Sequence, residues 1–478
     1  MSSIWSRSCE IGERECLRGN IETEVAVIGA GMAGILTAYE LQKSGKQVVM
    51  LEASRIASGQ TRNTTAKITI QHGLIYHKLW SRFGRNTAAD YAAANQNAFD
   101  EYRRIIEREG IECDFEEKCS YIYSQNPEHL KKETRAVSAL KMPAEFVRDI
   151  PVQIPCYGAV KFKDQAQFDP MKFIRAVAEP LTIYENTAVR AVKGNVLITN
   201  RGRVRAKQIV FACHYPFVNF PGLYFARMHQ ERSYVLALEY AKPVDGMIMG
   251  DEIGTYSFRN YGKLLLIGGE GHRTGENPDG GCYDRLRAKA RDLFPGSREV
   301  AHWSAQDCVT ADGVPYIGRY SSGKPNWYVA TGFGKWGMTS SMVSAMILRD
   351  MICGRKNQYA HVFDPSRFSA KDVPQIAAES GHAVKGLTRQ IFSIPSETVS
   401  ALKPEHGGVV SVKGEKLGVY RDENGEIHAV NIRCPHLGCQ LEWNPDELSW
   451  DCPCHGSRFD YKGNLIDNPA QNNLKHKR

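Results

Sequence analysis

The first 55 residues contain apolar stretches in an order typical of a strand, a helix and a second strand. An apolar stretch, VAVIG, begins near Thr23, and the following MAGILTAYELQKSG repeats its apolar positions at helical spacing until Gly45. Another apolar stretch, QVVMLE, comes next. A strand–helix–strand order predicts parallel strands, so we expect the chain to begin as an α/β fold.

The middle of the chain changes its hydrophobic pattern several times. Residues 78–140 have helical spacing, whereas residues 180–213 and 230–270 are typical of short strands. A strand near residue 327 enters a second glycine-rich turn, and a helix follows it as far as Cys353. The chain therefore returns to the strand–turn–helix pattern with which it began.

The last quarter of the chain differs from the rest. Residues 364–388 contain Pro and Ser and few large apolar residues, which predicts a linker. Residues 390–470 predict a small all-β unit of short strands. Its turns are expected at Gly407–Gly408, Lys413–Gly414, Asn424–Gly425 and Lys462–Gly463.

Composition excludes several classes of protein. The chain has 478 residues, 42% hydrophobic and 24% charged, which is typical of globular domains and not of disorder. The net charge is +8, but Lys and Arg are scattered, so nucleic acid binding is not expected. We expect no transmembrane segment, because no charge-free apolar run reaches about 18 residues. The N-terminal residues lack the apolar core of a signal peptide, so we expect a cytoplasmic protein.

The first glycine-rich turn has the GxGxxG spacing of Gly29, Gly31 and Gly34. In such a turn the first glycine permits a tight bend, the second admits a pyrophosphate close to the backbone, and the third lets helix and strand pack closely. The helix N-terminus then offers free N–H groups to phosphates. Glu52 ends the next strand, where an acid that binds a ribose is expected. We interpret the turn as a dinucleotide site; the alternative is a turn selected only for packing.

Two segments identify a family resemblance. The start, VAVIGAGMAGILTAYEL with VVMLEA and the stretch SGQTRNTTAK over residues 58–67, resembles the D-amino acid oxidase superfamily. The late segment TADGVPYIG, followed by YVATGFGKWGMT over residues 328–339, is similar to that family's C-terminal flavin motif. The resemblance implies a bound FAD. It implies FAD-binding residues at Gly29, Gly31, Gly34, Glu52, Arg62, Gly332, Gly334, Gly337, Met338 and Thr339.

The chain departs from this family at two positions near the late motif. Members that oxidise amino acids commonly have an arginine for the substrate carboxylate where this chain has Asp307. An acid there would repel a carboxylate and attract an amine, and Arg259 could replace the missing clamp through a bidentate contact. Relatives with covalently bound flavin have a cysteine where this chain has Ala305, so non-covalent FAD is expected. Asp307, Arg259 and His72 are the candidate catalytic residues. Weaker pocket candidates are His214, Tyr256, Tyr261, His272 and Trp336.

A second group of ligand-type residues lies in the all-β unit. Cys434-Pro-His436-Leu-Gly-Cys439 is followed after twelve residues by Cys452-Pro-Cys454-His455-Gly-Ser. Two thiolates on one iron and two imidazoles on the other define a Rieske [2Fe–2S] centre, and a structural zinc site is the alternative.

These two boxes resemble the Rieske proteins of cytochrome bc complexes. The resemblance implies Cys434, His436, Cys452 and His455 as ligands and a Cys439–Cys454 disulfide that clamps the two loops. It also places Ser457 as a hydrogen-bond donor to a bridging sulfide. Phe459 stands where high-potential members have a tyrosine, which predicts a potential in the middle or low part of the Rieske range.

The two resemblances together predict the architecture. We expect an α/β FAD/NAD(P)-binding Rossmann-type fold with a β-rich substrate domain, plus a C-terminal all-β Rieske domain. The predicted division is an N-terminal extension over 1–20, an FAD-dependent oxidoreductase domain over 21–363 that includes the substrate subdomain, a linker over 364–388 and the Rieske domain over 389–478.

The combination of cofactors predicts the function. We expect an FAD-dependent dehydrogenase that oxidises a C–N bond of an amine or amino-acid-like substrate. Electrons would pass through the Rieske cluster to a ferredoxin-, cytochrome- or quinone-type partner. One alternative is a redox-sensing or electron-transfer protein without a small substrate. Another is a Rieske oxygenase, for which His72 and His77 have a suggestive spacing, although Thr69 stands where an acidic iron ligand would be expected.

Overall fold

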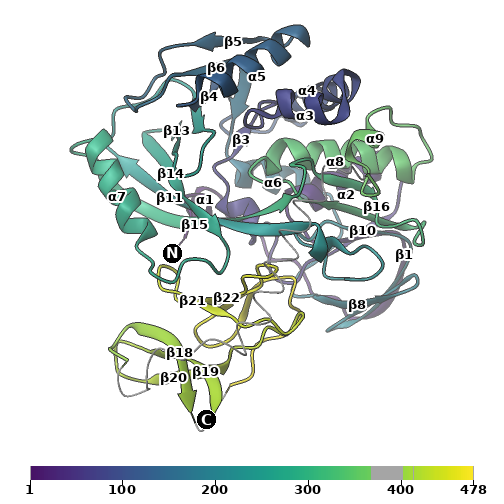
Figure 1. Cartoon of the computed structure of the whole chain (residues 1–478). Helices are drawn as coiled ribbons and strands as arrows, with labels where there is room; N and C mark the ends of the chain where they lie inside the picture. Colours follow the sequence, from purple (N-terminus) through teal and green to yellow (C-terminus); the bar gives the residue numbers. More distant parts are fainter. Residues whose placement is uncertain (1, 368–401, 413, 477–478) are drawn as a thin grey trace.

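The computed structural model describes residues 2–367, 402–412 and 414–476 (Figure 1). Its first sheet is the mostly parallel one that the N-terminal pattern predicts, and β1 at its centre is flanked by β2 and β10. The sheet has the order β16-β17-β10-β1-β2-β7, and β8 and β9 extend it from β10. These strands are β1 (Gly19–Ile28), β2 (Val48–Leu51), β7 (Ile183–Tyr184), β8 (Val189–Lys193), β9 (Val196–Thr199), β10 (Gly202–Phe211), β16 (Tyr316–Arg319) and β17 (Trp327–Thr331).

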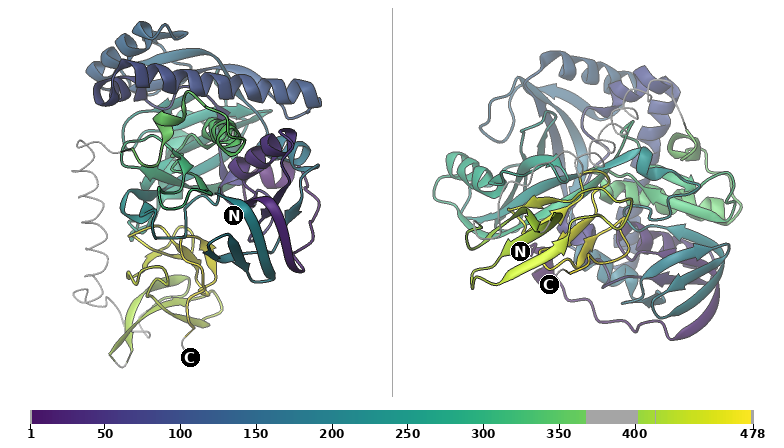
Figure 2. Two further views of the ribbon diagram at one scale, coloured as in Figure 1. Left: turned by 90° about the vertical axis from the view of Figure 1, so that its right-hand side faces the viewer. Right: turned by 60° about the horizontal axis from the view of Figure 1, so that its bottom comes forward.

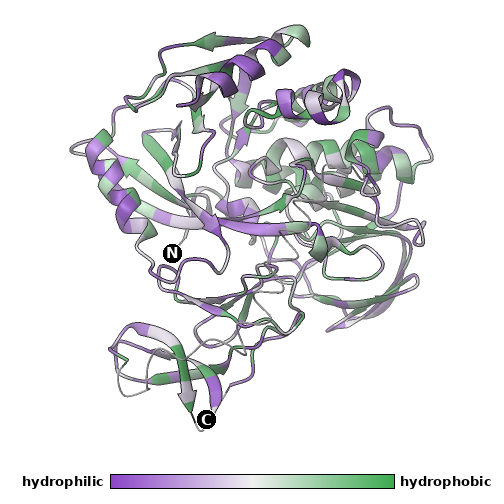
Figure 3. Ribbon diagram, in the orientation of Figure 1, coloured by the Kyte–Doolittle hydropathy of each residue, from purple (hydrophilic) through white to green (hydrophobic). Residues whose placement is uncertain are grey.

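Two apolar helices pack against each other beside this sheet. They are α2 (Met32–Lys43) and α8 (Gly337–Ile352), which follow the two glycine-rich turns. Helix α2 buries nearly every residue along its length and α8 buries most of its residues, and Figure 3 shows α8 as largely hydrophobic. Both turns are therefore held at one end of the same helix pair. Shorter helical elements nearby are α1 (Trp5–Ser8), η1 (Gln60–Asn63), α6 (Pro170–Ala178), η2 (Tyr224–Ala226) and α9 (Ala360–Phe363).

A second, larger sheet forms the β-rich substrate domain. Its order is β15-β11-β14-β13-β12-β4-β6-β3, and β5 pairs with β6. Its strands are β3 (Lys67–Ile68), β4 (Glu116–Ser124), β5 (Ala144–Val147), β6 (Gly158–Gln167), β11 (Met228–Glu239), β12 (Met247–Gly250), β13 (Ser257–Tyr261), β14 (Leu264–Arg273) and β15 (Arg298–Thr310). The helices α3 (Ile75–Phe83), α4 (Arg85–Glu109) and α5 (Pro127–Ala139) lie at its upper end, and α7 (Cys282–Leu293) lies at its side (Figure 1).

The long strands β11 and β15 pair at the edge of the second sheet and present two different faces. Residues opposite each other in an antiparallel pair share a face, and neighbours along a strand alternate. Glu231 pairs with Asp307 on one face, and Arg232 pairs with Gln306 on the other. Both functional parts of the molecule contact this pair of strands.

The C-terminal part is the small all-β domain, which lies below the α/β body in Figure 1 and comes forward in the right-hand view of Figure 2. One sheet contains β18 (His406–Val412), β19 (Glu415–Arg421) and β20 (Ile427–Asn431). The other contains β21 (Glu442–Asn444), β22 (Ser449–Asp451), β23 (Arg458–Asp460) and β24 (Leu465–Asp467). The fold class predicted from the sequence is confirmed.

Two local predictions need correction. No turn forms at Gly407–Gly408, because both residues lie in β18, and a Cβ on Gly407 would come within 2.5 Å of the Trp443 indole. Strand β4 interrupts the predicted helical segment, since its residues pair with β6 and β12. The predicted N-terminal extension is anchored to the body, because Trp5 is fully buried and its Nε1 donates to the Thr64 carbonyl at 2.7 Å.

The predicted linker lies mainly outside the described residues. Residues 368–388 and Lys413 of the expected 413–414 turn are among the residues not described, as are 389–401 of the predicted Rieske domain. Arg367, within the predicted linker, forms an ion pair with Asp312 at 2.7 Å. The predicted domain boundaries stay predictions. Among the described residues, no helix is long and apolar enough to cross a membrane.

Candidate functional site

The first glycine turn is shaped by two positions where a side chain would collide. A Cβ on Gly34 would lie 2.0 Å from the Gly29 carbonyl oxygen, and one on Gly29 would lie 2.6 Å from the Ala212 carbonyl oxygen. Gly29 also has a φ of +100°, which favours glycine. Gly31 faces Thr61, whose Oγ1 accepts a hydrogen bond from Met32 N at 3.0 Å. The bare backbone at the start of α2 fits the phosphates of a dinucleotide.

Glu52 ends β2 beside this turn. Its carboxylate accepts hydrogen bonds from Ala30 N at 2.8 Å and Ser54 N at 2.9 Å, and burial raises its pKa. The acid is therefore fixed where the sequence predicts a ribose contact. Arg62 lies in η1 near the same turn, and its carbonyl accepts a hydrogen bond from the Ser3 hydroxyl. The direct cofactor contacts of Glu52 and Arg62 stay predictions.

The late glycine turn is joined to the first motif through α8. A Cβ on Gly332 would lie 2.3 Å from the Thr310 methyl group, and Gly337 begins the helix. Thr339 Oγ1 accepts from Thr69 N at 3.1 Å and donates to the Thr69 carbonyl at 2.8 Å. The Met338 carbonyl accepts from the Tyr102 hydroxyl at 2.8 Å. Gly334 has a φ of +52°. The two segments that carry the family resemblance therefore meet in space.

His72 lies in this region and is held by contacts within the chain. Its Nε2 lies 2.7 Å from the Thr69 carbonyl, its Nδ1 lies 2.6 Å from the Tyr91 hydroxyl, and its ring stacks on Trp336. Burial lowers its pKa to about 3, so the ring is neutral. Both nitrogens are thus engaged within the chain, and a catalytic role for His72 stays a prediction. The same contacts argue against His72 and His77 as a pair of iron ligands.

Arg259, the predicted carboxylate clamp, is bound within the chain. The guanidinium is buried, and it donates through Nε to the Asn260 carbonyl and through Nη1 to the carbonyls of Thr65 and Ala66. Trp5 and Tyr261 place their rings against it. These contacts hold the start of β3 in place and occupy the donors that a carboxylate clamp would use. Arg259 therefore positions this segment, and its predicted role toward a substrate stays a prediction.

Asp307 lies in a group of charged residues on the inner face of β11 and β15, in which Asp307, Glu231 and Lys67 are half-buried and Lys335 is exposed. Burial raises its pKa to about 7, while Lys335 favours its ionised form. Burial likewise lowers the pKa of Lys67 to about 7, with Arg259 and Lys335 adding to the shift. Glu231, opposite Asp307, lies 3.1 Å from His229 Nε2. A catalytic role for Asp307 stays a prediction.

Three members of this charge group, Lys67, Lys335 and Glu231, were not predicted from the sequence. Lys67 ends the first motif and Lys335 lies inside the late one, so their positions within the motifs could have indicated that both lie near the site. The weaker candidates are dispersed. His214 bonds Gln230, and His272 bonds Tyr234, both near the Rieske domain. At the substrate sheet, Tyr256 bonds Glu270 and Tyr261 bonds Asp169.

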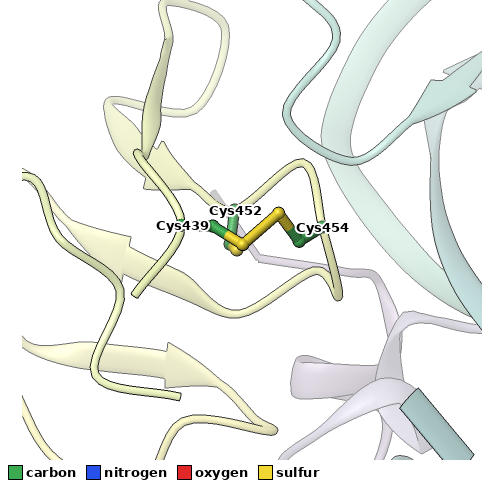
Figure 4. A group of neighbouring side chains, drawn as sticks. All are labelled: Cys439, Cys452 and Cys454. Atoms are coloured by element: carbon green, nitrogen blue, oxygen red, sulfur yellow. A yellow bond between two sulfur atoms is a disulfide. The ribbon is translucent and has the colours of Figure 1, made fainter. Parts of the chain in front are cut away.

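The two ligand boxes of the Rieske domain fold as similar loops. In one, Cys434 N donates to the Cys439 carbonyl and Gly438 N to the Cys434 carbonyl, each at 2.9 Å. In the other, Cys452 N donates to the Ser457 carbonyl at 2.8 Å and Gly456 N to the Cys452 carbonyl at 2.9 Å. The predicted Cys439–Cys454 disulfide joins the loops, and Figure 4 shows Cys452 beside it.

The four predicted cluster ligands lie together at these loops. The Cys434 and Cys452 thiols are buried and in hydrogen-bond contact, and the rings of His436 and His455 lie 4.9 Å apart at 89°. The buried Nδ1 of His436 has no hydrogen-bond partner in the described part of the chain. Burial lowers the pKa of His436 to about 4, so the ring is neutral as a metal ligand must be. Two thiols and two imidazoles in this arrangement fit a [2Fe–2S] cluster.

The residues beside the cluster loops also match the expected surroundings. Ser457 is fully buried and its Oγ accepts from Ala470 N at 2.9 Å, while Cys434 is within its hydrogen-bonding reach. Phe459 is fully buried on β23 and has no hydroxyl to offer. The roles of both residues toward the cluster stay predictions.

The Rieske domain docks on the outer face of β11 and β15. Gln230 Nε2 donates to the His455 carbonyl at 2.7 Å, and Gln306 Nε2 donates to the Gly456 carbonyl at 2.9 Å. Gly456 leaves no room for a Cβ, which would lie 2.6 Å from the Gln230 side chain. The loop around a cluster ligand is therefore packed directly on the strand that carries Asp307.

Comparison with known proteins agrees with this architecture. The family model of FAD dependent oxidoreductases matches residues 24–351, and the model of the Rieske [2Fe-2S] domain matches residues 394–477. YhfW of Bacillus subtilis (strain 168), a protein named for a Rieske 2Fe-2S iron-sulfur centre, is 36% identical over 99% of this chain and 97% of its own length.

Solved structures resemble about three quarters of the chain. L-proline dehydrogenase from P. horikoshii has a TM-score of 0.63 at 18% identity, over 74% of this chain and 98% of its own. Glycine oxidase from Geobacillus kaustophilus has a TM-score of 0.61 at 17% identity, over 73% of this chain and 100% of its own. These likenesses establish the fold. The protein is an oxidoreductase of the FAD-dependent D-amino acid oxidase family that binds FAD and carries a C-terminal Rieske [2Fe–2S] domain.

Proposed function

We propose that this protein is a dehydrogenase that oxidises a C–N bond of an amine or amino-acid-like substrate and passes the electrons through its Rieske domain to an external acceptor. FAD supplies hydride acceptance, and a Rieske cluster supplies transfer of single electrons. Conversion of a CH–NH group to C=N releases two electrons and two protons. Two one-electron acceptors balance the electrons, and the protons pass to solvent.

The observation that carries the proposal is the shared strand β15. Gly334 N, in the late flavin motif, donates to the Cys308 carbonyl at 2.8 Å. Two residues earlier, Gln306 contacts the cluster loop. Consecutive Cα atoms are about 3.8 Å apart, so the flavin-motif contact and the cluster-loop contact are separated by one short stretch of backbone. Such a separation favours rapid electron transfer between the two sites.

The substrate class rests on the charges near Asp307. An ionised Asp307 would attract an ammonium group, and Lys335 and Lys67 could bind an acidic group on the same substrate. Arg259 is committed elsewhere, so a carboxylate would have to use the lysines. The acceptor would be a ferredoxin-, cytochrome- or quinone-type carrier. The cytoplasmic location expected from the sequence stays a prediction.

A two-stage experiment tests the proposal. First, the holoprotein is mixed anaerobically with a panel of amines and amino acids while flavin absorbance is followed. Bleaching by one class would support a dehydrogenase, and no bleaching by any compound would favour the redox-sensing alternative. Second, turnover is measured in a Cys434→Ser variant with one-electron carriers. Flavin bleaching with turnover equal to that of the natural protein for every acceptor would refute electron exit through the cluster.

A further inference from the structure

A loop of the oxidoreductase domain reaches the cluster end of the Rieske domain. It spans residues 212–223 between β10 and η2, and we call it the cluster-facing loop. The Oδ1 of Asn219 lies 2.8 Å from Nε2 of His436. Just beyond the loop, Phe225 packs edge-on against the His455 ring at 5.7 Å. Both histidine ligands therefore contact the oxidoreductase domain through their side chains.

The geometry of His436 defines the chemistry of its contact with Asn219. The buried Nδ1 has no hydrogen-bond partner in the described residues, which leaves it for the metal. A neutral imidazole bound to a metal through Nδ1 carries its proton on Nε2. Nε2–H is then the donor, and Asn219 Oδ1 is the acceptor.

The cluster-facing loop is held firmly enough to fix Asn219. The Asn219 carbonyl accepts from Leu223 N at 2.9 Å within the loop. The Tyr320 hydroxyl bonds the Val218 carbonyl on one side of Asn219. On the other side, Arg227 Nη2 donates to the Gly222 carbonyl at 2.9 Å. Asn219 is therefore anchored before and after its own position.

We propose that Asn219 is a positioning residue through which the oxidoreductase domain orients His436 and sets the reduction potential of the Rieske cluster. An acceptor on the Nε2–H of a ligand imidazole increases the electron donation of that ring, which favours the oxidised iron. Asn219 also uses the outward N–H of His436, so an external partner cannot use it. The inference goes beyond the proposed function, because it holds for any substrate and for either direction of electron flow.

The test is an EPR-monitored redox titration of the full-length holoprotein. Asn219→Leu removes the acceptor at similar volume, and we expect it to favour the reduced cluster by about tenfold, or about 59 mV upward for one electron. Asn219→Asp keeps the shape and adds negative charge, and we expect a shift in the opposite direction. Phe220→Ala alters the neighbouring residue, which is 69% exposed, and is expected to leave the potential unchanged.

The result for Asn219→Leu decides between this role and a merely structural one. A potential that is unchanged or lower in the leucine variant, with its EPR spectrum intact, would overturn the proposal. If the leucine variant does not retain the cluster, Asn219→Ala is measured in its place and judged by the same criterion. Because the titration needs no substrate, a failed substrate screen would not affect its outcome.

Discussion

Arg232 of the oxidoreductase domain and Glu447 of the Rieske domain form a buried ion pair across the domain interface. Arg232 Nε lies 3.0 Å from the Glu447 carboxylate, and their side chains are only 2% and 7% exposed. Arg458 approaches the same carboxylate at 3.0 Å. A charge network that is this deeply buried fixes how the two domains dock, because any other orientation would leave a buried charge without its partner.

We predict that Glu447→Gln weakens the docking of the Rieske domain. Removing one partner of a buried ion pair typically costs about 3–5 kcal/mol, since the remaining charges stay buried. The expected results are a lower melting temperature and faster proteolysis between the domains. Glu239→Gln is the matched control, because Glu239 pairs with Arg298 at the surface and should cost no more than about 1 kcal/mol. Equal effects of the two variants would contradict a docking role.

The same network predicts sensitivity to acid. Burial alone would raise the pKa of Glu447, but Arg232 and Arg458 outweigh it and lower the pKa to about 2. The resulting stabilisation is complete above the unfolded-state pKa of about 4.3 and is lost as pH falls toward 2. The difference in unfolding free energy between the natural protein and Glu447→Gln should therefore shrink over this range. Denaturant titrations at pH 6, 4 and 3 would measure it, and a constant difference would contradict the assignment.

We predict that Gly34→Ala weakens FAD binding without affecting the cluster. The added Cβ would lie 2.0 Å from the Gly29 carbonyl, and relief of such a clash costs about 1–3 kcal/mol. We expect roughly ten- to hundredfold weaker flavin retention with an unchanged Rieske EPR signal. Gly323→Ala is the control, because a Cβ there meets nothing within 4 Å. Full flavin retention in Gly34→Ala would exclude the tight turn as the binding site.

The sequence predicted those parts of the molecule that depend on local patterns. Gly29 and Gly34 could be predicted because only glycine fits their turn. Cys434 and His436 could be predicted because the spacing of ligands within one loop is a local pattern. Gly407 was misread because its glycine serves distant packing against Trp443, which no local pattern shows. The burial of Trp5 was not predicted for the same reason, because its partners Thr64 and Tyr261 are remote in sequence.

The roles of individual charged residues were less predictable. Arg259 has the residue type expected of a carboxylate clamp, but the fold brings the Thr65 and Ala66 carbonyls to it from nearly 200 positions away. Asp307 was identified from its motif position, whereas Glu231 lies outside both motifs and joins it only through tertiary contacts. The contact of Asn219 with His436 crosses the domain interface and had no sequence signal at all.

We predict that Asp307 controls the pH dependence of flavin reduction. Burial raises its pKa to about 7, so the carboxyl is neutral below this pH and ionised above it. If the ionised form attracts the substrate amine, the second-order rate of flavin reduction should rise through pH 7 and should lose this limb in Asp307→Asn. Lys67 loses its charge over the same range, so Lys67→Met is the necessary comparison. A rising limb that persists in Asp307→Asn but disappears in Lys67→Met would assign the titration to Lys67 instead.

We predict that the cluster has a potential in the middle or low part of the Rieske range of roughly −150 to +300 mV. Phe459 is fully buried on β23 and cannot donate a hydrogen bond, so the reduced cluster lacks one stabilising contact. Phe459→Tyr should add a donor and raise the potential, whereas Tyr461→Phe, which removes a hydroxyl two residues away, should leave it unchanged. EPR-monitored titration of the three proteins measures both effects. A natural potential near the top of the range, or a fall in Phe459→Tyr, would show that position 459 does not control the cluster.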